Sequence, residues 1–135
     1  RRQYQKLADR LGVTGHVRFL GHEEDISKLY AQADVLVSSS RCEGLPFCVM
    51  EALYFGLPVI ASDIKGHRDL IEHAYNGLLY DLKSDYDLAK HMIALGAFGE
   101  ERSYLSANSV LPGEYLIGAV IEEYRRITRL PGVTL

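Results

Sequence analysis

Two carboxylates flank a short apolar segment near the middle of the chain. Glu43 and Glu51 stand 8 residues apart, with Gly44 and Pro46 between them. Glycine permits a backbone to approach a ligand closely, and proline suits the first turn of a helix because an N–H there has no intrahelical partner. The spacing predicts a loop that turns into a helix and holds one carboxylate on each part. We interpret this stretch, residues 38–51, as a ligand site.

The backbone of this stretch favours a phosphate group. Gly44, Leu45, Phe47 and Cys48 can offer N–H groups at the start of a helix, whereas Pro46 cannot donate. Carboxylates beside a phosphate are unfavourable unless they face hydroxyl groups or cations. We therefore expect a ligand that is also rich in hydroxyl donors, and a nucleotide-sugar meets both demands.

The elements that must position this turn alternate between strand and helix. Residues 35–37 and 58–61 are apolar runs without alternation, as expected for parallel strands covered on both faces. A helix over 46–54 would present Val49, Met50 and Leu53 to the core. We predict an α/β fold with a Rossmann-like, doubly wound parallel sheet, in which ligands bind beyond the carboxyl ends of the strands.

Further elements follow from helical spacing and turn residues. Gly12 is expected to end the first helix in a left-handed conformation. Residues 128–135 show no periodicity, so we divide the chain into one domain over 1–127 and a tail. The pattern predicts further helices at 1–11, 26–33, 67–72, 86–95, 100–107 and 115–127, and strands at 16–20 and 78–80.

Composition narrows the class of protein. The 135 residues are 47% hydrophobic and 24% charged, which suits one globular domain with a buried core. A net charge of -3 gives no electrostatic case for a nucleic-acid partner. No apolar run approaches the roughly 20 residues that span a bilayer, and the start resembles no signal peptide. We expect a cytoplasmic protein with reduced thiols. The chain opens on Arg1 inside a predicted helix, which indicates a fragment of a longer protein.

The two cysteines lie inside the central stretch. Cys42 and Cys48 are 6 residues apart, a spacing that matches no common metal-binding pattern. A disulfide between them would strain the junction of loop and helix. We expect reduced thiols beside the site.

The central stretch resembles a known enzyme family. Residues 43–53, followed by 56–61, look like the E-x7-E signature and following strand of the group 1 (family GT4) glycosyltransferases. Residues 17–21, 33–35, 66–71 and 76–79 fall where that family places its other recurrent features. An isolated E-x7-E would be weak evidence, but the ordered set over about 1–127 is strong.

The resemblance implies a GT-B enzyme of two Rossmann-like domains, with this chain forming most of the C-terminal, donor-binding one. In such enzymes the second glutamate, here Glu51, holds the ribose hydroxyls. The first, here Glu43, holds the transferred sugar and is our candidate catalytic residue. The backbone of the residues between them approaches the sugar and diphosphate, and the turn after the first strand lies near the base. The implied donor-binding set is Glu43, Gly44, Leu45, Pro46, Phe47, Glu51, Leu20 and Gly21.

The resemblance also implies the reaction and its partners. The expected donor is a UDP- or GDP-hexose, and the expected acceptor is a glycan or a lipid-linked sugar of capsule or another polysaccharide. Transfer is expected to retain configuration and to need neither metal nor cofactor, and association with the inner face of the membrane stays open. The acceptor side belongs to an N-terminal domain outside this sequence, so the fragment alone should be inactive. A nucleotide-sugar-binding module without catalysis and an epimerase of the same fold are the alternatives.

The family's strand order, 3-2-1-4-5-6, predicts a gap in the sheet. This sequence contains counterparts of strands 3, 4, 5 and 6 but not of the two that separate 3 from 4, nor of the family's usual basic pair for the diphosphate. We expect either a piece of a larger folded object or an exchange of residues 1–20 with a neighbour. Direct parallel pairing of 16–20 with 35–38 would contradict this expectation.

Several other polar residues have both a functional and an ordinary interpretation. His67 and Arg68 follow the strand at 58–61 and could line the cleft, although for Arg68 and Lys65 a solvated surface position is favoured. Asp85 and Asp87 spell the D-x-D of another glycosyltransferase class, yet a capping role at the next helix is favoured. We expect structural roles for His22, Glu23 and Glu24 at a helix start, His91 on a helix surface, and Tyr30, Tyr54, Tyr115 and Tyr124 in core or interdomain packing.

Overall fold

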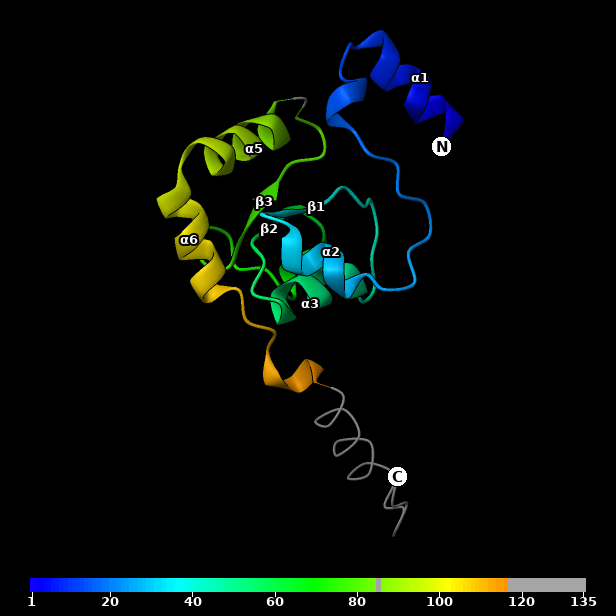
Figure 1. Cartoon of the computed structure of the whole chain (residues 1–135). Helices are drawn as coiled ribbons and strands as arrows, with labels where there is room; N and C mark the ends of the chain where they lie inside the picture. Colours follow the sequence, from blue (N-terminus) through cyan, green and yellow to red (C-terminus); the bar gives the residue numbers. More distant parts are fainter. Residues whose placement is uncertain (85, 117–135) are drawn as a thin grey trace.

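A computed structural model describes residues 1–84 and 86–116 and shows an α/β architecture (Figure 1). The strands are β1 (Leu36–Ser38), β2 (Val59–Ser62) and β3 (Gly77–Tyr80). The helices are α1 (Arg2–Arg10), α2 (Ser27–Gln32), α3 (Phe47–Tyr54), α4 (Lys65–Arg68), α5 (Asp87–Ala97) and α6 (Gly99–Asn108), with two short 3-10 turns, η1 (Thr14–His16) and η2 (Gly113–Tyr115).

The three strands form one parallel sheet in the order β1-β2-β3. In this register Val37 lies beside Ile60, and Ile60 lies beside Leu78. All three strands therefore end at the same edge of the sheet. The loops that leave this edge are the natural place for a ligand.

Both faces of the central strand β2 are covered, which explains its unbroken apolar run, whereas Val37 of β1 is 39% exposed. Val59 and Ala61 pack with residues of α2 and α3 on one face. Ile60, between them, packs with Leu95 of α5 and Leu105 of α6 on the other face. Because successive strand residues point to opposite faces, a strand between two helical layers must be apolar at every position. The predicted Rossmann-like fold class is confirmed.

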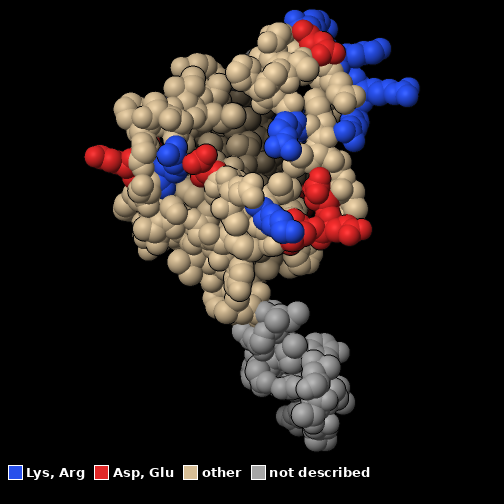
Figure 2. Space-filling model, viewed as in Figure 1, with Lys and Arg blue, Asp and Glu red and all other residues tan. Residues whose placement is uncertain are grey.

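The N-terminal part lies apart from this three-layer body (Figure 1). Helix α1 buries Ala8 but leaves Tyr4 and Leu11 each 63% exposed. Gly12 follows with φ +70, as predicted for a left-handed helix end. Figure 2 shows basic side chains gathered at the α1 end and a hollow between this end and the rest of the molecule.

The strand predicted at 16–20 is wrong. Residues 14–16 form η1, and Val17 has extended backbone angles but joins no sheet. A strand needs a neighbour to satisfy its ladder of hydrogen bonds, and among the described residues no strand lies beside this segment. The direct pairing of 16–20 with 35–38 that would have contradicted a gap is likewise absent from the described part of the sheet.

Other boundaries shift by a few residues. Helix α4 spans 65–68 rather than the predicted 67–72, because residues 70 and 71 turn inward to join the core. Of the helix predicted at 115–127, only the start is described, and it is the 3-10 turn η2; the remainder and the tail lie outside the described residues. No helix in the described ranges is both long and apolar enough to cross a membrane.

Candidate functional site

The loop over residues 39–46 leaves the carboxyl end of β1 and leads into α3, as the sequence predicted. Glu43 sits half-buried in this loop, and its carboxylate accepts a hydrogen bond of 2.6 Å from the Ser40 hydroxyl. A charge-assisted bond of this kind restricts the orientation of the carboxylate. Glu43 is therefore held by its own loop at the edge of the sheet where ligands bind.

Glu51 lies in the second turn of α3 and is exposed, yet it has a specific partner. The Tyr30 hydroxyl of α2 donates to Glu51 Oε2 at 2.9 Å. Burial raises the pKa of Tyr30, and the hydrogen bond to the Glu51 carboxylate raises it further. The Tyr30 ring stacks on Phe55 at 5.6 Å between centroids. Tyr30 thus combines the predicted packing role with orientation of Glu51, which the sequence did not reveal.

The start of α3 presents backbone donors between the two carboxylates. Helix α3 begins at Phe47, one residue later than predicted, and the Pro46 carbonyl accepts the first helical amide bonds. Within residues 1–84 and 86–116, the amides of Gly44, Leu45, Phe47 and Cys48 donate to no protein acceptor. Four unpaired N–H groups at a helix start make a favourable environment for an anion.

The two glutamates act on the thiol of Cys48 through their charge. Partial burial of the sulfur raises the pKa of this thiol, and the charges of Glu43 and Glu51 raise it further. Cys42 and Cys48 are free and exposed, in agreement with the predicted reduced thiols.

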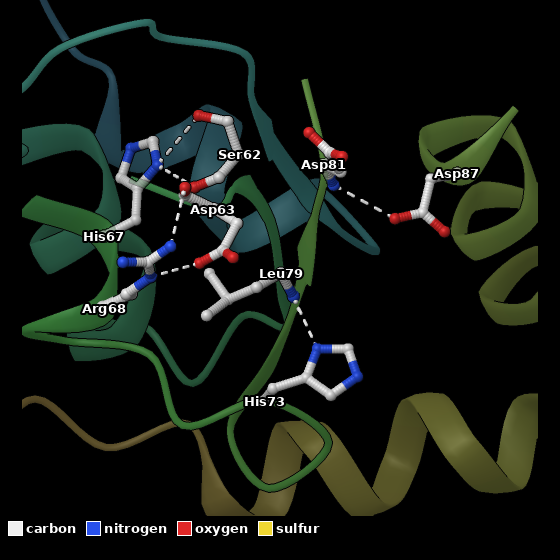
Figure 3. Close-up of polar contacts among 8 residues, drawn as sticks. All are labelled: Ser62, Asp63, His67, Arg68, His73, Leu79, Asp81 and Asp87. Carbon is white, nitrogen blue, oxygen red and sulfur yellow. Dashed lines mark hydrogen bonds and ion pairs between the residues drawn. The ribbon is translucent and has the colours of Figure 1, made fainter. Parts of the chain in front are cut away.

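His67 does not line an open cleft, contrary to one of the sequence expectations. It is completely buried, at 0% exposure, in α4. Its Nδ1 lies 2.8 Å from the Ser62 carbonyl oxygen (Figure 3). Its Nε2 lies 3.2 Å from the Ser38 hydroxyl. A buried imidazole avoids a large desolvation cost only when both nitrogens have partners, as they do here.

Gly66 brings α4 into direct contact with the site loop. A Cβ atom at this position would lie 2.4 Å from the Glu43 carbonyl oxygen, closer than side chains approach in proteins. Only glycine lets the two backbones come this close. The sequence contained this residue within the family-like segment, but its reason is a tertiary contact 23 residues away (66 − 43 = 23).

Arg68 and Lys65 occupy the surface positions favoured by the sequence. The Arg68 guanidinium donates to the Asp63 carboxylate (Figure 3). Lys65 pairs with Asp69 at 2.7 Å. Arg68 also borders a surface hollow formed with residues 69–72, 75–76, 107–108, 110 and 112 rather than with the loop at Glu43. No contact with the site loop among the described residues therefore supports the alternative that Arg68 lines the cleft.

Leu20 and Gly21 remain separate from the two carboxylates. Both are exposed, and Gly21 has φ +85. The hydrogen bond that ties this segment down runs from Arg1 to the Phe19 carbonyl at 2.6 Å. No hydrogen bond or ion pair between described residues joins 20–21 to the site loop. Contacts within the described residues therefore do not bring Leu20 and Gly21 to the site, where they were predicted to lie near the base.

Other polar candidates have structural surroundings. Asp87 begins α5 and accepts a bond from the Asp81 amide at 3.1 Å, so it anchors the end of β3 rather than capping its own helix (Figure 3); Asp85 lies outside the described residues. His91 is not a surface residue, because its side chain is only 12% exposed and packs edge-on against His73. Within the described ranges, no group of three or more histidine, cysteine or acidic side chains could hold a metal ion.

Some of the remaining aromatic and acidic candidates pack against the core, and others are exposed. Tyr115 packs against the core on the α3 side, as predicted for this aromatic set. Tyr54 is 68% exposed, so its interdomain role stays a prediction, and Tyr124 lies outside the described residues. His22 and the acidic run at 23–25 are exposed ahead of α2, where Asp25 pairs with Lys28 at 2.9 Å.

Sequence reasoning missed the hydroxyl groups that support the site. Ser38 and Ser62 are the last residues of β1 and β2, and Ser40 lies in the loop after β1. Ser38 contacts His67, the Ser62 hydroxyl donates to the Ser40 carbonyl, and the Ser40 hydroxyl donates to Glu43. The run of three serines at 38–40 directly after a buried strand was the available signal. Polar residues at the carboxyl end of a parallel strand often serve a ligand or the loop that binds it.

Comparison with known proteins is consistent with this geometry. The family model described as "Glycosyl transferases group 1" matches residues 1–110. LpsE of Rhizobium meliloti, a lipopolysaccharide core biosynthesis glycosyltransferase, is 30% identical over 124 residues, which cover 90% of this chain and 36% of LpsE. A Campylobacter jejuni N-acetylgalactosaminyltransferase, named for an N,N'-diacetylbacillosaminyl-diphospho-undecaprenol acceptor, is 35% identical over 82 residues, 61% of this chain and 22% of that protein.

A solved structure shares the fold. HepE of Anabaena, crystallised with UDP-glucose, superposes with a TM-score of 0.84 at 23% identity, covering 96% of this chain and 36% of HepE. The chain thus spans about a third or less of the length of these proteins. The family match covers most of the sequence and includes both glutamates. The chain therefore belongs to the group 1 glycosyl transferases.

Proposed function

We propose that this chain is the donor-binding part of a glycosyltransferase that moves a hexose from a nucleotide-diphospho-sugar to a glycan or lipid-linked acceptor. One observation carries the proposal: unpaired amides at the start of α3 lie between two carboxylates that are each oriented by a hydroxyl group. This arrangement suits a ligand with a phosphate centre and hydroxyl-bearing groups on both sides.

The roles divide along the ligand. Glu51, on the rigid helix and fixed by Tyr30, is assigned to the ribose hydroxyls. Glu43, on the loop, is assigned to the transferred sugar, and the backbone from Gly44 to Phe47 to the diphosphate. Glu43 is accordingly the residue of this chain closest to the chemistry. Leu20 and Gly21 are assigned to the base, an arrangement that requires the segment after η1 to be held near the site by the rest of the protein.

Retention of configuration and independence of metal extend the proposal. Helix-start amides can stabilise the charge that develops on a departing diphosphate, because preorganised donors need no reorganisation during the reaction. The basic side chains and the catalytic base would then come from outside this chain, so the fragment alone is proposed to be inactive. The narrower assignment to family GT4 is likewise part of this proposal.

The acceptor and location follow from relatives rather than from this site. The names of LpsE and of the Campylobacter enzyme refer to lipopolysaccharide core and to an undecaprenol-linked sugar. We propose a polysaccharide-building role, in capsule or a related glycan, for a cytoplasmic enzyme that meets its acceptor at the inner face of the membrane.

Calorimetry with the full-length protein tests the donor site. Glu51→Ala should weaken UDP or GDP binding about tenfold or more, because a hydrogen bond to a charged group contributes roughly 1.5–3 kcal/mol. Glu24→Ala, which removes an exposed carboxylate elsewhere, is the matched control and should bind like wild type. Unchanged nucleotide affinity in Glu51→Ala would count against the assignment.

Turnover separates the alternatives. Incubation with UDP- and GDP-hexoses and a panel of glycan acceptors should release the nucleotide diphosphate and extend an acceptor. Donor binding without any turnover would instead favour a binding module, and a new nucleotide-sugar formed without acceptor would favour an epimerase.

A further inference from the structure

A chain of hydrogen bonds leads from buried His67 to Glu43. The carbonyl oxygen of Ser62 can only accept, so the Nδ1–H of His67 donates to it, and Nε2 lies 3.2 Å from the Ser38 hydroxyl. The Ser62 hydroxyl lies 3.2 Å from the same Nδ1 and donates to the Ser40 carbonyl, and the Ser40 hydroxyl donates to Glu43. His67 therefore joins the ends of β1 and β2 to the loop that carries the first glutamate.

A second contact acts on the same loop from the same helix. Gly66, the neighbour of His67 in α4, lies against the Glu43 backbone so closely that no side chain fits between them. Hydrogen bonds from His67 and its serines fix the start of the loop, and α4 supports its middle. Ser62 is 0% exposed and Ser38 7% exposed, so the bonds are shielded from competing water.

A histidine at the buried position 67 indicates a role beyond packing. A core position needed for packing alone is filled by an apolar side chain without the desolvation cost of an imidazole. Here a fully buried histidine uses both nitrogens on the two strand ends that border the site loop. Such a network specifies one loop geometry rather than adding bulk to the core.

We propose that His67 is a positioning residue that, through Ser38, Ser62 and Gly66, holds the 39–46 loop so that Glu43 meets the transferred sugar. The proposal rests on the function assigned to Glu43 above. It predicts that binding of the sugar part of the donor depends on this hydrogen-bond network. Binding of the nucleotide part, held by Glu51 and α3, should not depend on it.

Ser62→Ala in the full-length protein is the main test, because it removes one buried hydroxyl and leaves the fold otherwise intact. Affinity for UDP-glucose should fall about 2- to 10-fold, the range expected for one net hydrogen bond, while affinity for UDP alone changes less than about twofold. If the wild-type protein binds guanine nucleotides rather than uracil nucleotides, GDP-mannose and GDP should be used in place of UDP-glucose and UDP. Ser103→Ala, which changes an exposed serine of α6 for whose side chain no hydrogen bond is found among the described residues, is the matched control outside the site loop.

His67→Asn is the second variant, since its amide can still donate near the Nδ1 position but cannot reach Ser38. It should show the same selective loss of UDP-glucose affinity. Equal loss of UDP and UDP-glucose affinity in folded variants would mean a general structural role and would overturn the proposal, as would no loss of either.

Hydrogen exchange separates this inference from the proposed function. In ligand-free Ser62→Ala, amides of residues 40–45 should exchange faster than in wild type and in Ser103→Ala, with α5 and α6 unchanged. Unaltered exchange in the loop would overturn the positioning role. If the loop loosens as expected but wild type binds no nucleotide-sugar, the positioning role stands and the donor assignment of Glu43 fails.

Discussion

Gly66→Ala probes the contact between α4 and the site loop most directly. The added Cβ would lie 2.4 Å from the Glu43 carbonyl oxygen and 2.9 Å from its carbonyl carbon. Ordinary contact begins at 3.4 Å, so the loop must move by about 1 Å (3.4 − 2.4). Overpacking of this kind costs about 1–3 kcal/mol. The helical preference of alanine offsets about 1 kcal/mol of this cost, which leaves a net destabilisation of about 0–2 kcal/mol.

Gly96→Ala is the matched control for stability. Gly96 lies in α5, and a Cβ there would meet nothing within 4 Å. The substitution should stabilise the protein by about 0.5–1 kcal/mol through helix propensity alone. The difference between the two variants in urea unfolding therefore isolates the clash with the loop.

Donor binding provides the functional measurement for the same pair of variants. A shift of about 1 Å at Glu43 should weaken UDP-glucose binding about tenfold in Gly66→Ala, since a charged hydrogen bond loses its geometry. Gly96→Ala should bind like wild type. If Gly66→Ala is as stable as Gly96→Ala and binds UDP-glucose normally, the close contact does not constrain the loop and the reasoning is refuted.

Three further predictions concern single side chains. Tyr30→Phe keeps the ring but loses the bond to Glu51, so UDP affinity should fall about 3- to 10-fold by calorimetry; wild-type affinity would contradict it. Burial lowers the pKa of His91 below its ordinary 6.5, so the unfolded chain binds more protons and stability present above pH 6.5 declines on acidification. His91→Gln should flatten this decline in urea unfolding between pH 7 and 5; an unchanged slope would argue against it. Asn76→Ala should destabilise by about 2–3 kcal/mol, because it removes two bonds of a buried amide. Half-buried Asn108→Ala, which loses only one solvent-exposed bond to Tyr104, should have a smaller effect, and equal midpoints in thermal unfolding would contradict the prediction.

Local patterns in the sequence were sufficient for the central elements. The apolar runs before the site loop and after α3 are both strands of one parallel sheet. The run after α3 is covered on both faces, as an unbroken apolar strand requires, whereas Val37 of β1 is 39% exposed. The helix that carries Glu51 was predicted to within one residue at its start. Val49, Met50 and Leu53 are buried in α3, as its helical spacing indicated.

The strand predicted at 16–20 shows where local pattern was insufficient. Its residues have a strand-like composition, and Val17 has extended angles, but pairing depends on a neighbouring strand that this sequence does not supply among its described residues. His67 failed for a different reason. A histidine after a strand has the same local pattern whether it faces a cleft or the core, and only the packing of α4 against β1 and β2 made it a buried one.

By itself, then, the sequence determined the type and order of the elements around Glu43 and Glu51 and the family to which they belong, because periodicity, turn residues and motif spacing are local properties. The tertiary structure alone decided how the carboxylates are held. Tyr30 reaches Glu51 from another helix, and Gly66 touches Glu43 across the loop. These contacts join residues more than 20 positions apart, so their existence depends on how the layers pack around the sheet rather than on any pattern within one segment.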